Sequence, residues 1–572
     1  MVQRKLLKPF VLRYSWRLLI TGLVGVLSST LTILLPVFMG KFYELMFSTG
    51  GQRLALLGFL PKAAVQDIPQ FLLYFLGLIG FYVWVGYAKR YLVASAGELL
   101  SFELRNLLFT HQLKLQAKVY EEKGVGKYLL RYSGDLKSIQ HYLTRGMIGF
   151  GVDMLMVGLF LWVLASISSF LMLVSLFSIC LILLPLAFLN RRLHEASTRR
   201  RNQKSGLLSF VSQRLQAIFT IKAFNREVPE RARFLKKSQR VLATDLTFHH
   251  VSSQIYVLVP GMLYGMIGVM MYAIYWRQQK GFQIDEAELF TAFLLIMTML
   301  PVLRRCLRVT VTWKLGLISL RKLQRVLDLP TEEKEDWDDL HLPEGLVRLD
   351  EVCLLSSGQP LFQPFSAIWS PQSIHLIKGG TGAGKSSLVK VLLGLEKEFR
   401  GEILLDNQSI REVTVKSLRK QLSIISLDYS LLGHTVFEAI SYSRKASKRK
   451  GAKSMLEKVQ LGLPESARLK LDDSIGRHGS SLSKGQELML LVTRALLTRK
   501  PILLLDEPFQ AVEPDFQVHL IQLLQRLRKK RTIVLLVKSH EVPDLEFDSI
   551  TELRKAKKLP TAVIRKIKKN AS

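Results

Sequence analysis

Residues 379–386 read GGTGAGKS, and this stretch decides which fold the second half of the chain adopts. It fits the pattern G-x-x-x-x-G-K-[ST], in which glycines let backbone N–H groups surround phosphate oxygens. In such a loop, Lys385 reaches the outer phosphates and Ser386 offers its hydroxyl to Mg²⁺. The apolar SIHLI at 373–377 predicts a strand before the loop, and the next residues predict a helix whose positive end faces the anion. This order indicates an α/β nucleotide-binding domain.

A second motif, PILLLDEP at 501–508, supplies what the phosphate loop lacks. It predicts a buried hydrophobic strand that ends in two carboxylates. We expect Asp506 to hold Mg²⁺ together with Ser386, and Glu507 to polarise the attacking water as the catalytic carboxylate. The residues expected to bind the nucleotide are Gly379, Gly380, Thr381, Gly382, Ala383, Gly384, Lys385, Ser386, Ser387 and Asp506.

A third motif, LSKGQ at 482–486, lies between these two and opens a helical run. The order and spacing of the three motifs resemble the ATP-binding cassette (ABC) family, in which LSKGQ is the signature motif. The resemblance implies that ATP lies between the phosphate loop of one cassette and the signature of another. Ser483, Gly485 and Gln486 are then expected to serve the ATP of a partner, so the chain must dimerise.

The composition is both apolar and basic. Hydrophobic residues make up 49%, mean hydropathy is +0.21, the formal net charge is +34 and the sequence pI is about 10.0. This balance suggests a membrane protein with basic cytoplasmic surfaces, because nucleic-acid binders carry such charge on soluble folds. We therefore expect lipid contact and no nucleic-acid partner. Cys180, Cys306 and Cys353 have no paired spacing, which argues against a disulfide framework or a zinc site.

Six segments are long and apolar enough to span a bilayer, which takes about 20 residues. They are Leu18 to Met39, Phe71 to Ala88, Met147 to Ala165, Phe170 to Leu189, Ile255 to Trp276, and Leu289 to about Trp313. The first segment is too long, and too soon followed by other spans, to be a cleaved signal peptide.

Lys and Arg residues are concentrated before the first span and in the long connections after spans two and four. By the positive-inside rule these regions are cytoplasmic, as are both termini and the cassette. In a bacterium the membrane would be the inner, or plasma, membrane. The two long inside connections, 97–146 and 190–251, predict helices that protrude into the cytoplasm. Such stalks are typical of exporters, whereas a six-helix channel does not need them.

The predicted fold class is a multi-domain membrane protein with a six-helix, all-α transmembrane domain and an α/β P-loop domain. The expected boundaries are 1–329 for the transmembrane domain with two coupling hairpins, 330–345 for an acidic linker, 346–553 for the cassette and 554–572 for a basic tail. Segments 124–139 and 220–234 look like the two coupling-helix regions of ABC exporters, so the resemblance covers nearly the whole chain.

Four positions of the cassette depart from the family pattern. Ser356 or a neighbour stands where the family usually has an adenine-stacking aromatic residue, and Leu427 stands where a glutamine contacts Mg²⁺ and the attacking water. An ungapped alignment puts Lys538 at the position of the switch histidine and leaves His540 two residues later. We keep His540 as a candidate catalytic residue.

The fourth departure is Glu513, which replaces the aspartate of the loop that pairs the two cassettes. Together the four changes favour a weakened ATP site, while the intact Glu507 and LSKGQ argue for retained ATP binding and a sound signature. The leading hypothesis is a subunit of an ATP-driven exporter, the weaker-site half of a heterodimer that uses ATP and Mg²⁺. The alternative is a non-hydrolysing regulatory subunit that gates a partner.

Charged residues in the membrane half raise a cargo hypothesis. Arg304, Arg305 and Arg308 lie in the sixth span, and Arg304 is about 22 Å in from Leu289 at about 1.5 Å per residue. Asp153 lies about 9 Å in from Met147, at a similar depth of the membrane. Buried charges of this kind face a cavity or each other. They therefore have either a structural role, as an Arg–Asp pair or as side chains that snorkel to the cytoplasmic surface, or they line a basic cavity for an anionic or amphipathic substrate such as a lipid or an acidic peptide.

Overall fold

The computed structural model describes residues 2–47, 68–123, 128, 131–280, 286–332, 338–342, 344–356, 359–476, 479–510 and 512–556. The chain divides into two compact units. The helical unit comprises Met1–Gln112 and Val125–Asp328, and the cassette unit comprises Leu113–Gly124 and Leu329–Ser572. A short segment of the first half of the chain therefore belongs to the cassette unit.

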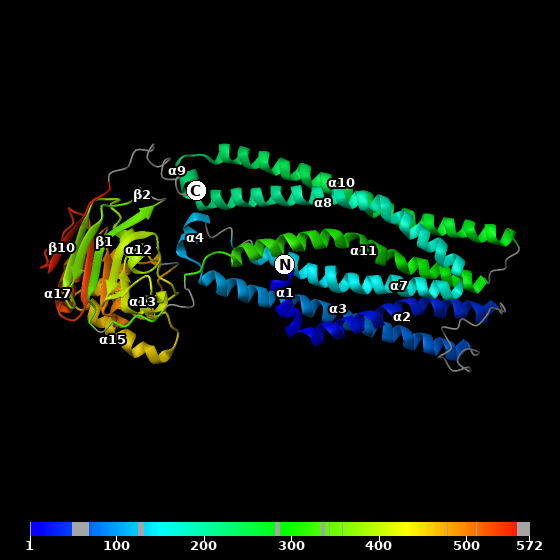
Figure 1. Cartoon of the computed structure of the whole chain (residues 1–572), viewed down its shortest axis with the longest axis horizontal. Helices are drawn as coiled ribbons and strands as arrows, with labels where there is room; N and C mark the ends of the chain where they lie inside the picture. Colours follow the sequence, from blue (N-terminus) through cyan, green and yellow to red (C-terminus); the bar gives the residue numbers. More distant parts are fainter. Residues whose placement is uncertain are drawn as a thin grey trace. The chain divides into compact units, whose positions relative to one another are not determined.

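The helical unit consists mainly of long helices (Figure 1). Its elements are α1 (Val2–Arg13), α2 (Ser15–Phe47), α3 (Ile68–Leu113), the π-helical segments η3 (Arg131–Asp135) and η4 (Tyr142–Gly149) with α6 (Leu136–His141) between them, α7 (Phe150–Ile167), α8 (Ser169–Gln216), α9 (Ile218–Ala223), α10 (Glu227–Gln279) and α11 (Glu286–Leu327).

Each of the six segments predicted to span the membrane lies within one continuous run of helix. Five helical runs in the described residues are long and apolar enough to cross a bilayer: Ser15–Phe47, Ile68–Leu113, Leu136–Ile167, Glu227–Gln279 and Leu289–Leu327. The predicted fourth span lies in α8, where the apolar stretch found is the shorter Ser169–Leu181. Large side chains such as Leu73 and Trp84 on α3 are exposed, as expected for a surface that faces lipid.

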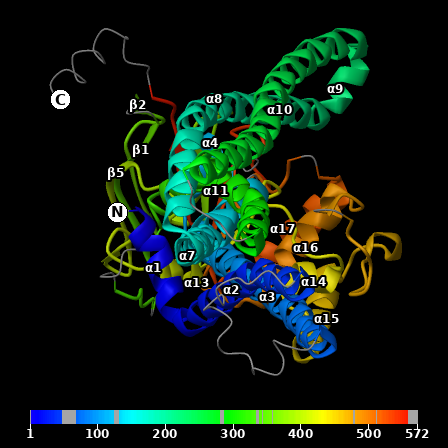
Figure 2. The same cartoon turned by 90° about the vertical axis from the view of Figure 1, so that its right-hand side faces the viewer.

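The membrane helices pack around a shared apolar cluster. Phe160 and Leu164 of α7 and Leu295 of α11 are fully buried in it. Helices α2 and α11 approach so closely that a Cβ at Gly40 would overlap the hydroxyl of Thr291. Helices α8 and α10 also contribute to this cluster, and they run side by side and are connected by the short helix α9 (Figures 1 and 2).

A buried carboxylate joins three helical segments of this unit. Asp135, at the end of η3, is 3% exposed and accepts hydrogen bonds from Arg131 (2.5 Å), Arg201 of α8 (2.9 Å) and Ser319 of α11 (2.9 Å). Burial of a charge is costly unless it is paired and hydrogen-bonded, and here both conditions hold. This network connects η3 with α8 and α11.

The cassette unit contains two five-stranded sheets and their covering helices (Figure 1). One sheet is antiparallel, with the order β2-β1-β5-β6 and β3 on β1, and the other is parallel, with the order β10-β4-β9-β8-β7. The strands are β1 (Val347–Ser356), β2 (Gln359–Pro360), β3 (Phe365–Trp369), β4 (Ile374–Gly379), β5 (Phe399–Leu405), β6 (Gln408–Ser409), β7 (Leu422–Ile425), β8 (Ile502–Asp506), β9 (Thr532–Val537) and β10 (Ser549–Leu553).

The helices of the cassette unit are α4 (Ala117–Lys123), α12 (Lys385–Leu392), α13 (Val415–Gln421), α14 (Val436–Ser441), α15 (Arg449–Gln460), α16 (Lys484–Leu497) and α17 (Pro514–Leu527), with short 3₁₀ turns η5 (Ala446–Lys448) and η6 (Glu465–Ala467). Every residue of β8 and β9 is buried, as the continuous apolar runs ILLLD and TIVLLV predict for central strands of a covered parallel sheet. The carboxyl ends of β4, β7, β8 and β9 therefore meet at one edge.

The segment from the first half of the chain contacts the cassette through ion pairs. Lys118 lies 2.7 Å from Glu398, and Glu121 lies 2.8 Å from Lys390 of α12. The segment grouped with the cassette is Leu113–Gly124, which adjoins the first coupling region predicted at 124–139; that assignment stays a prediction. The segment's signal in the sequence was weak, because seven helical residues between longer helices have no distinctive periodicity.

Parts of two predicted segments lie outside the described residues. In the predicted linker these are residues 333–337 and 343, and in the predicted tail they are residues 557–572. At the start of the linker, Glu332 forms an ion pair with Arg419 of α13 at 2.8 Å, so this residue is tied to the cassette.

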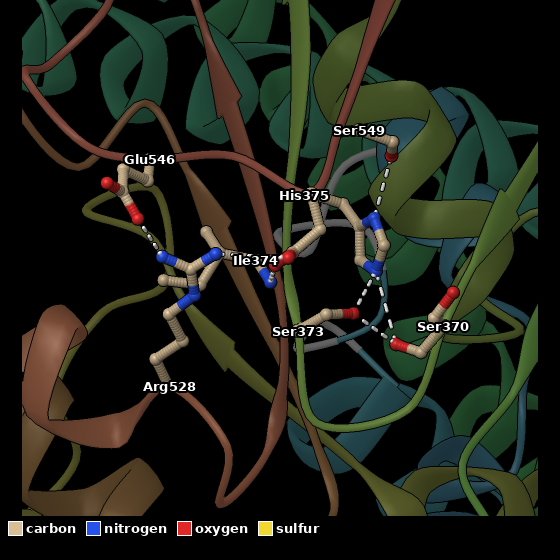
Figure 3. A network of polar contacts seen from close by, with 8 residues as sticks. Ser370, Ser373, Ile374, His375, Arg528, Glu546 and Ser549 are labelled. Atoms are coloured by element: carbon tan, nitrogen blue, oxygen red, sulfur yellow. Dashed lines mark hydrogen bonds and ion pairs between the residues drawn. The ribbon is translucent and has the colours of Figure 1, made fainter.

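A buried histidine stabilises the start of β4, the strand that leads to the phosphate loop (Figure 3). His375 is 1% exposed, and its ring nitrogens contact Ser549 Oγ (2.7 Å) and Ser373 Oγ (2.6 Å). Beside it, Asp548 accepts from the N–H of Ile374 (2.7 Å) and from Arg528 (3.1 Å). Burial lowers the pKa of His375, because the charged imidazolium loses hydration that its neutral partners do not replace.

This histidine predicts an acid sensitivity of the cassette. Because its folded-state pKa lies below the ordinary value of 6.5, the stability gained from the neutral ring is present above that value and is lost as pH falls through the folded-state pKa. Melting temperature of the full chain, measured between pH 7.5 and pH 5, should fall less steeply in His375→Gln than in wild type. The exposed His341 provides the control: His341→Gln should keep the wild-type slope, and equal slopes for all three proteins would contradict the assignment.

Candidate functional site

The phosphate loop leaves β4 at Gly379 and leads directly into α12. Gly382 (φ 75°) and Gly384 (φ 95°) adopt left-handed backbone conformations that favour glycine. A Cβ at Gly384 would also lie 2.7 Å from the buried ring of Phe362. The loop therefore needs glycine at these positions both for its turn and for its close contact with Phe362.

Lys385 is buried beneath this loop, with 3% of its surface exposed. Its Nζ donates to the carbonyl oxygens of Gly379 (2.9 Å) and Gly380 (3.2 Å) and lies 3.0 Å from Glu507 Oε1. The two motifs found in the sequence thus meet through an ion pair between the phosphate-binding cation and the predicted catalytic carboxylate.

Asp506 ends β8 next to this pair and is 5% exposed. The hydroxyl of Ser386 donates to its carboxylate, while Asp506 Oδ1 has no hydrogen-bond partner among the described residues. Burial raises the pKa of Asp506 to about 6, and the charges of Glu507 and Asp428 act in the same direction. A buried carboxylate oxygen without a donor, beside a serine hydroxyl, is a donor set suited to Mg²⁺.

Glu507 has an unusual backbone conformation, with φ 47° in the left-handed region. Its N–H donates to the carbonyl of Leu536 on β9 (2.9 Å), so the sheet holds the residue as β8 ends. A non-glycine residue in this region stores strain, which is frequent at functional sites. The bend directs the side chain toward Lys385 rather than along the strand.

The signature motif forms the amino end of α16. Ser483 is the N-cap, and it shares a capping box with Gln486, in which each side chain accepts from the backbone of the other. The N–H of Gly485 lies in the same first turn and donates to Glu513 Oε2 at 3.1 Å. Lys484, the atypical residue of the motif, pairs with Glu487 at 2.7 Å.

The other residues expected in the phosphate loop have different environments. Thr381 and Gly382 are exposed, Ser387 is half-buried, and Ala383 is buried in the core of the cassette. A cavity of about 860 Å³ lies elsewhere in this unit, between β7, α14, α15 and α16, and the phosphate loop does not line it. Gly380 of the loop, like Thr381 and Gly382, is exposed.

Leu427 lies two residues after Ile425, the last residue of β7. Ile425 pairs with Leu505 of β8, the residue directly before Asp506. Its side chain packs against the apolar core of the cassette. A leucine in that position offers no oxygen to a metal or to water. Asp428, the next residue, lies close enough to Asp506 for their charges to interact.

His540 is the third residue after the end of β9. Its side chain is 75% exposed, and Nε2 lies 3.5 Å from Glu541 Oε1. Lys538 is the first residue after β9 at the carboxyl edge and is mostly buried, with Nζ 3.4 Å from Glu541. A catalytic role of His540 stays a prediction. The side chain of Ser356 lies outside the described residues.

In the helical unit, Arg305 of α11 and Asp153 of α7 form a two-pronged ion pair. Arg305 Nε lies 3.0 Å from both carboxylate oxygens, and Nη2 lies 2.7 Å from Oδ1. For these two residues the structure shows the Arg–Asp pair that the sequence analysis considered. The side chain of Arg308 lies outside the described residues.

Two further cations lie near this pair. Arg304 stacks over Tyr256 of α10 at 5.5 Å, and its Nε is buried without a hydrogen-bond partner among the described residues. Lys89 of α3 lies close enough to Arg305 and Asp153 to interact with their charges, and its Nζ is 3.5 Å from Ser28 Oγ. The sequence analysis missed Lys89, although a lysine directly after an apolar span was a usable signal. The carboxylate of Asp153 thus lies close to two cations, Lys89 and Arg305, while Arg304, the neighbour of Arg305 in the sequence, stacks on Tyr256.

Comparisons with known proteins agree with both units. The family of the ABC transporter transmembrane region matches residues 18–300, and the ABC transporter family matches residues 362–510. The chain belongs to the ABC transporter family. It carries the membrane region and the ATP-binding cassette in one polypeptide, as the sequence motifs predicted.

Curated relatives of this ABC transporter include two proteins named ATP-dependent lipid A-core flippase. The protein from Nitrosococcus oceani is 24% identical over 507 residues, covering 85% of this chain and 81% of the relative. The protein from Methylococcus capsulatus is 27% identical over 478 residues, covering 79% and 76%. A solved bacterial Atm1-family ABC exporter with ATP bound has the same fold, with a TM-score of 0.79, 20% identity and 95% coverage of both chains.

These findings confirm the predicted fold class, an exporter-type membrane domain with an α/β cassette. The chain is an integral, multi-pass membrane protein and an ABC-type ATPase that couples ATP hydrolysis to transport. The cassette binds nucleotide.

Proposed function

We propose that this ABC transporter works as one half of a dimeric exporter in which each ATP lies between two cassettes. The observation that carries the proposal is the open phosphate loop, whose Lys385 and Glu507 face each other while Ser483 and Gly485 lie on a separate helix. Lys385 would bind the outer phosphates, Ser386 and Asp506 would hold Mg²⁺, and Glu507 would orient water. Ser483, Gly485 and Gln486 would contact the nucleotide of the partner.

We further propose that the two ATP sites are unequal and that the partner is a different half-transporter. Leu427 packs against the core and cannot position water, and the side chain of His540 is exposed, whereas the signature helix begins with a complete capping box. Phosphoryl transfer depends mainly on positioning and electrostatics, so the loss of one positioning residue costs rate rather than binding. A homodimer would repeat these defects at both sites.

Unequal sites predict an asymmetric response to mutation in the reconstituted heterodimer. Glu507→Gln in this chain should reduce ATP-driven transport less than the equivalent change in the partner, because this site contributes little turnover. Ser483→Ala should be nearly as damaging as the partner's own catalytic loss, since this signature serves the partner's ATP. Brisk ATPase activity of this chain alone, eliminated by Glu507→Gln, would contradict the proposal; absence of any turnover with any partner would favour the regulatory alternative.

For the cargo, we propose an anionic amphiphile of the lipid class. The relatives above are named for a lipid, and the cluster formed by Asp153, Lys89, Arg305 and the adjacent Arg304 holds more positive than negative charge. An unpaired guanidinium at membrane depth is costly unless it meets an anion or water. A phosphate or carboxylate headgroup would supply the missing acceptors, with the acyl chains in the apolar bundle. Both termini and the cassette would be cytoplasmic, following the distribution of Lys and Arg.

This cargo proposal predicts selective stimulation of the ATPase in proteoliposomes. Phosphate-bearing amphiphiles should stimulate it, and Arg304→Gln should lower that stimulation about 10-fold at subsaturating amphiphile, the value of one charge-assisted contact. Arg192→Gln is the matched control, because Arg192 also stacks on an aromatic ring, that of Phe188 at 4.5 Å, but lies outside the cluster. Stimulation by cationic amphiphiles alone, surviving Arg304→Gln combined with Arg305→Gln, would contradict an anionic cargo.

A further inference from the structure

The amino end of the signature helix α16 contacts a carboxylate of the same chain, that of Glu513. Its first turn leaves backbone N–H groups without partners inside the helix. The capping box satisfies the N–H of Gln486, and the N–H of Gly485 donates to the carboxylate of Glu513 at 3.1 Å. A carboxylate at a helix amino end is favoured by both the N–H donor and the helix dipole.

The close approach of the Glu513 carboxylate to α16 requires glycine at position 485. A Cβ added at Gly485 would lie 2.6 Å from Glu513 Oε2 and 2.4 Å from the ring of Phe516, so only glycine admits this contact. Glu513 is itself the N-cap residue of α17, yet its side chain forms no cap hydrogen bond with that helix. It crosses instead to α16, and an aspartate, one methylene shorter, would not reach as far.

The carboxylate also lacks a neutralising cation. Among the described residues, no Lys or Arg is recorded within ion-pair distance of Glu513, and the nearby Lys484 is engaged by Glu487 at 2.7 Å. The carboxylate of Glu513 therefore accepts from the Gly485 N–H, the donor that the proposed function assigns to the phosphate of the partner's ATP. The single N–H of Gly485 cannot donate a full hydrogen bond to a Glu513 oxygen and to a phosphate oxygen at the same time.

We propose that Glu513 acts as an internal competitor for the nucleotide, occupying the Gly485 amide until the partner's ATP displaces it. The inference rests on the proposed sharing of ATP between two cassettes. Its consequence is a raised ATP requirement for cassette closure, without a change in how tightly the chain binds ATP at its own phosphate loop. Glu513, a residue that departs from the family pattern, thereby sets the ATP concentration at which the two cassettes close on the nucleotide.

The test compares full-length transporters reconstituted with the partner half where one is required. Glu513→Gln keeps the shape but removes the charge, and charge-assisted hydrogen bonds are about twice as strong as neutral ones. We expect the KM for ATP to fall about 5-fold in Glu513→Gln, with kcat little changed. Asp515→Asn is the control, since it removes the same charge from the first turn of α17 at an exposed position without a recorded contact to the signature.

Two further measurements separate the outcomes. Glu513→Asp, which keeps the charge but shortens the reach, should also lower the KM, and it replaces Glu513→Gln if that variant melts at a lower temperature. An unchanged or raised KM in both variants would overturn the inference and assign Glu513 a merely structural role. Binding of a fluorescent ATP analogue tests the underlying proposal: if it is absent in wild type, or unaffected by Lys385→Ala, the shared-ATP function itself fails.

Discussion

The parallel pairing of β4, β9 and β8 fixes the distance between the phosphate loop and the two carboxylates that follow β8. Lys378 of β4 lies opposite Val537 of β9, and Leu536 of β9 lies opposite Asp506 of β8. The three strands therefore end at one edge of the sheet. A one-residue slip of β8 would turn its side chains to the opposite face of the sheet. The 3.0 Å pair between Lys385 and Glu507, and the free oxygen of Asp506 beside Ser386, both follow from this register.

Charged side chains are paired to different extents in the two units. In the helical unit, the buried Asp135 accepts from three donors and joins η3, α8 and α11, whereas the buried Asp153 forms an ion pair with Arg305 and leaves the nearby Lys89 without an ion pair of its own among the described residues. In the cassette unit, the exposed carboxylate of Glu513 accepts from one N–H and has no ion-paired cation among the described residues. Fully paired charges stabilise a fold, while incompletely paired ones retain affinity for a ligand. The incompletely paired groups are the ones for which we propose cargo and nucleotide roles.

Much of this arrangement could be predicted from local sequence. GGTGAGKS and LLLDEP specify backbone geometry and burial through short, strongly constrained patterns, so the loop, Lys385, Asp506 and Glu507 were found from the sequence. The Arg305 and Asp153 partnership was one of two alternatives, because sequence gives depth along a helix but not which helices face each other. The contact of Glu513 with Gly485, and the position of Lys89 beside Arg305, join residues of different elements and required the tertiary structure.

Hydrogen–deuterium exchange of the full-length transporter with Mg²⁺-ATP tests most directly whether one nucleotide bridges two cassettes. Bound phosphate should slow exchange of backbone N–H groups in both 379–387 and 482–487 over the same range of ATP concentration, since each ATP would contact both segments. Lys385→Ala should remove both effects together when both halves carry the change. Slowed exchange confined to 379–387 at saturating ATP would contradict the account, because the nucleotide would then occupy a single cassette without its partner's signature.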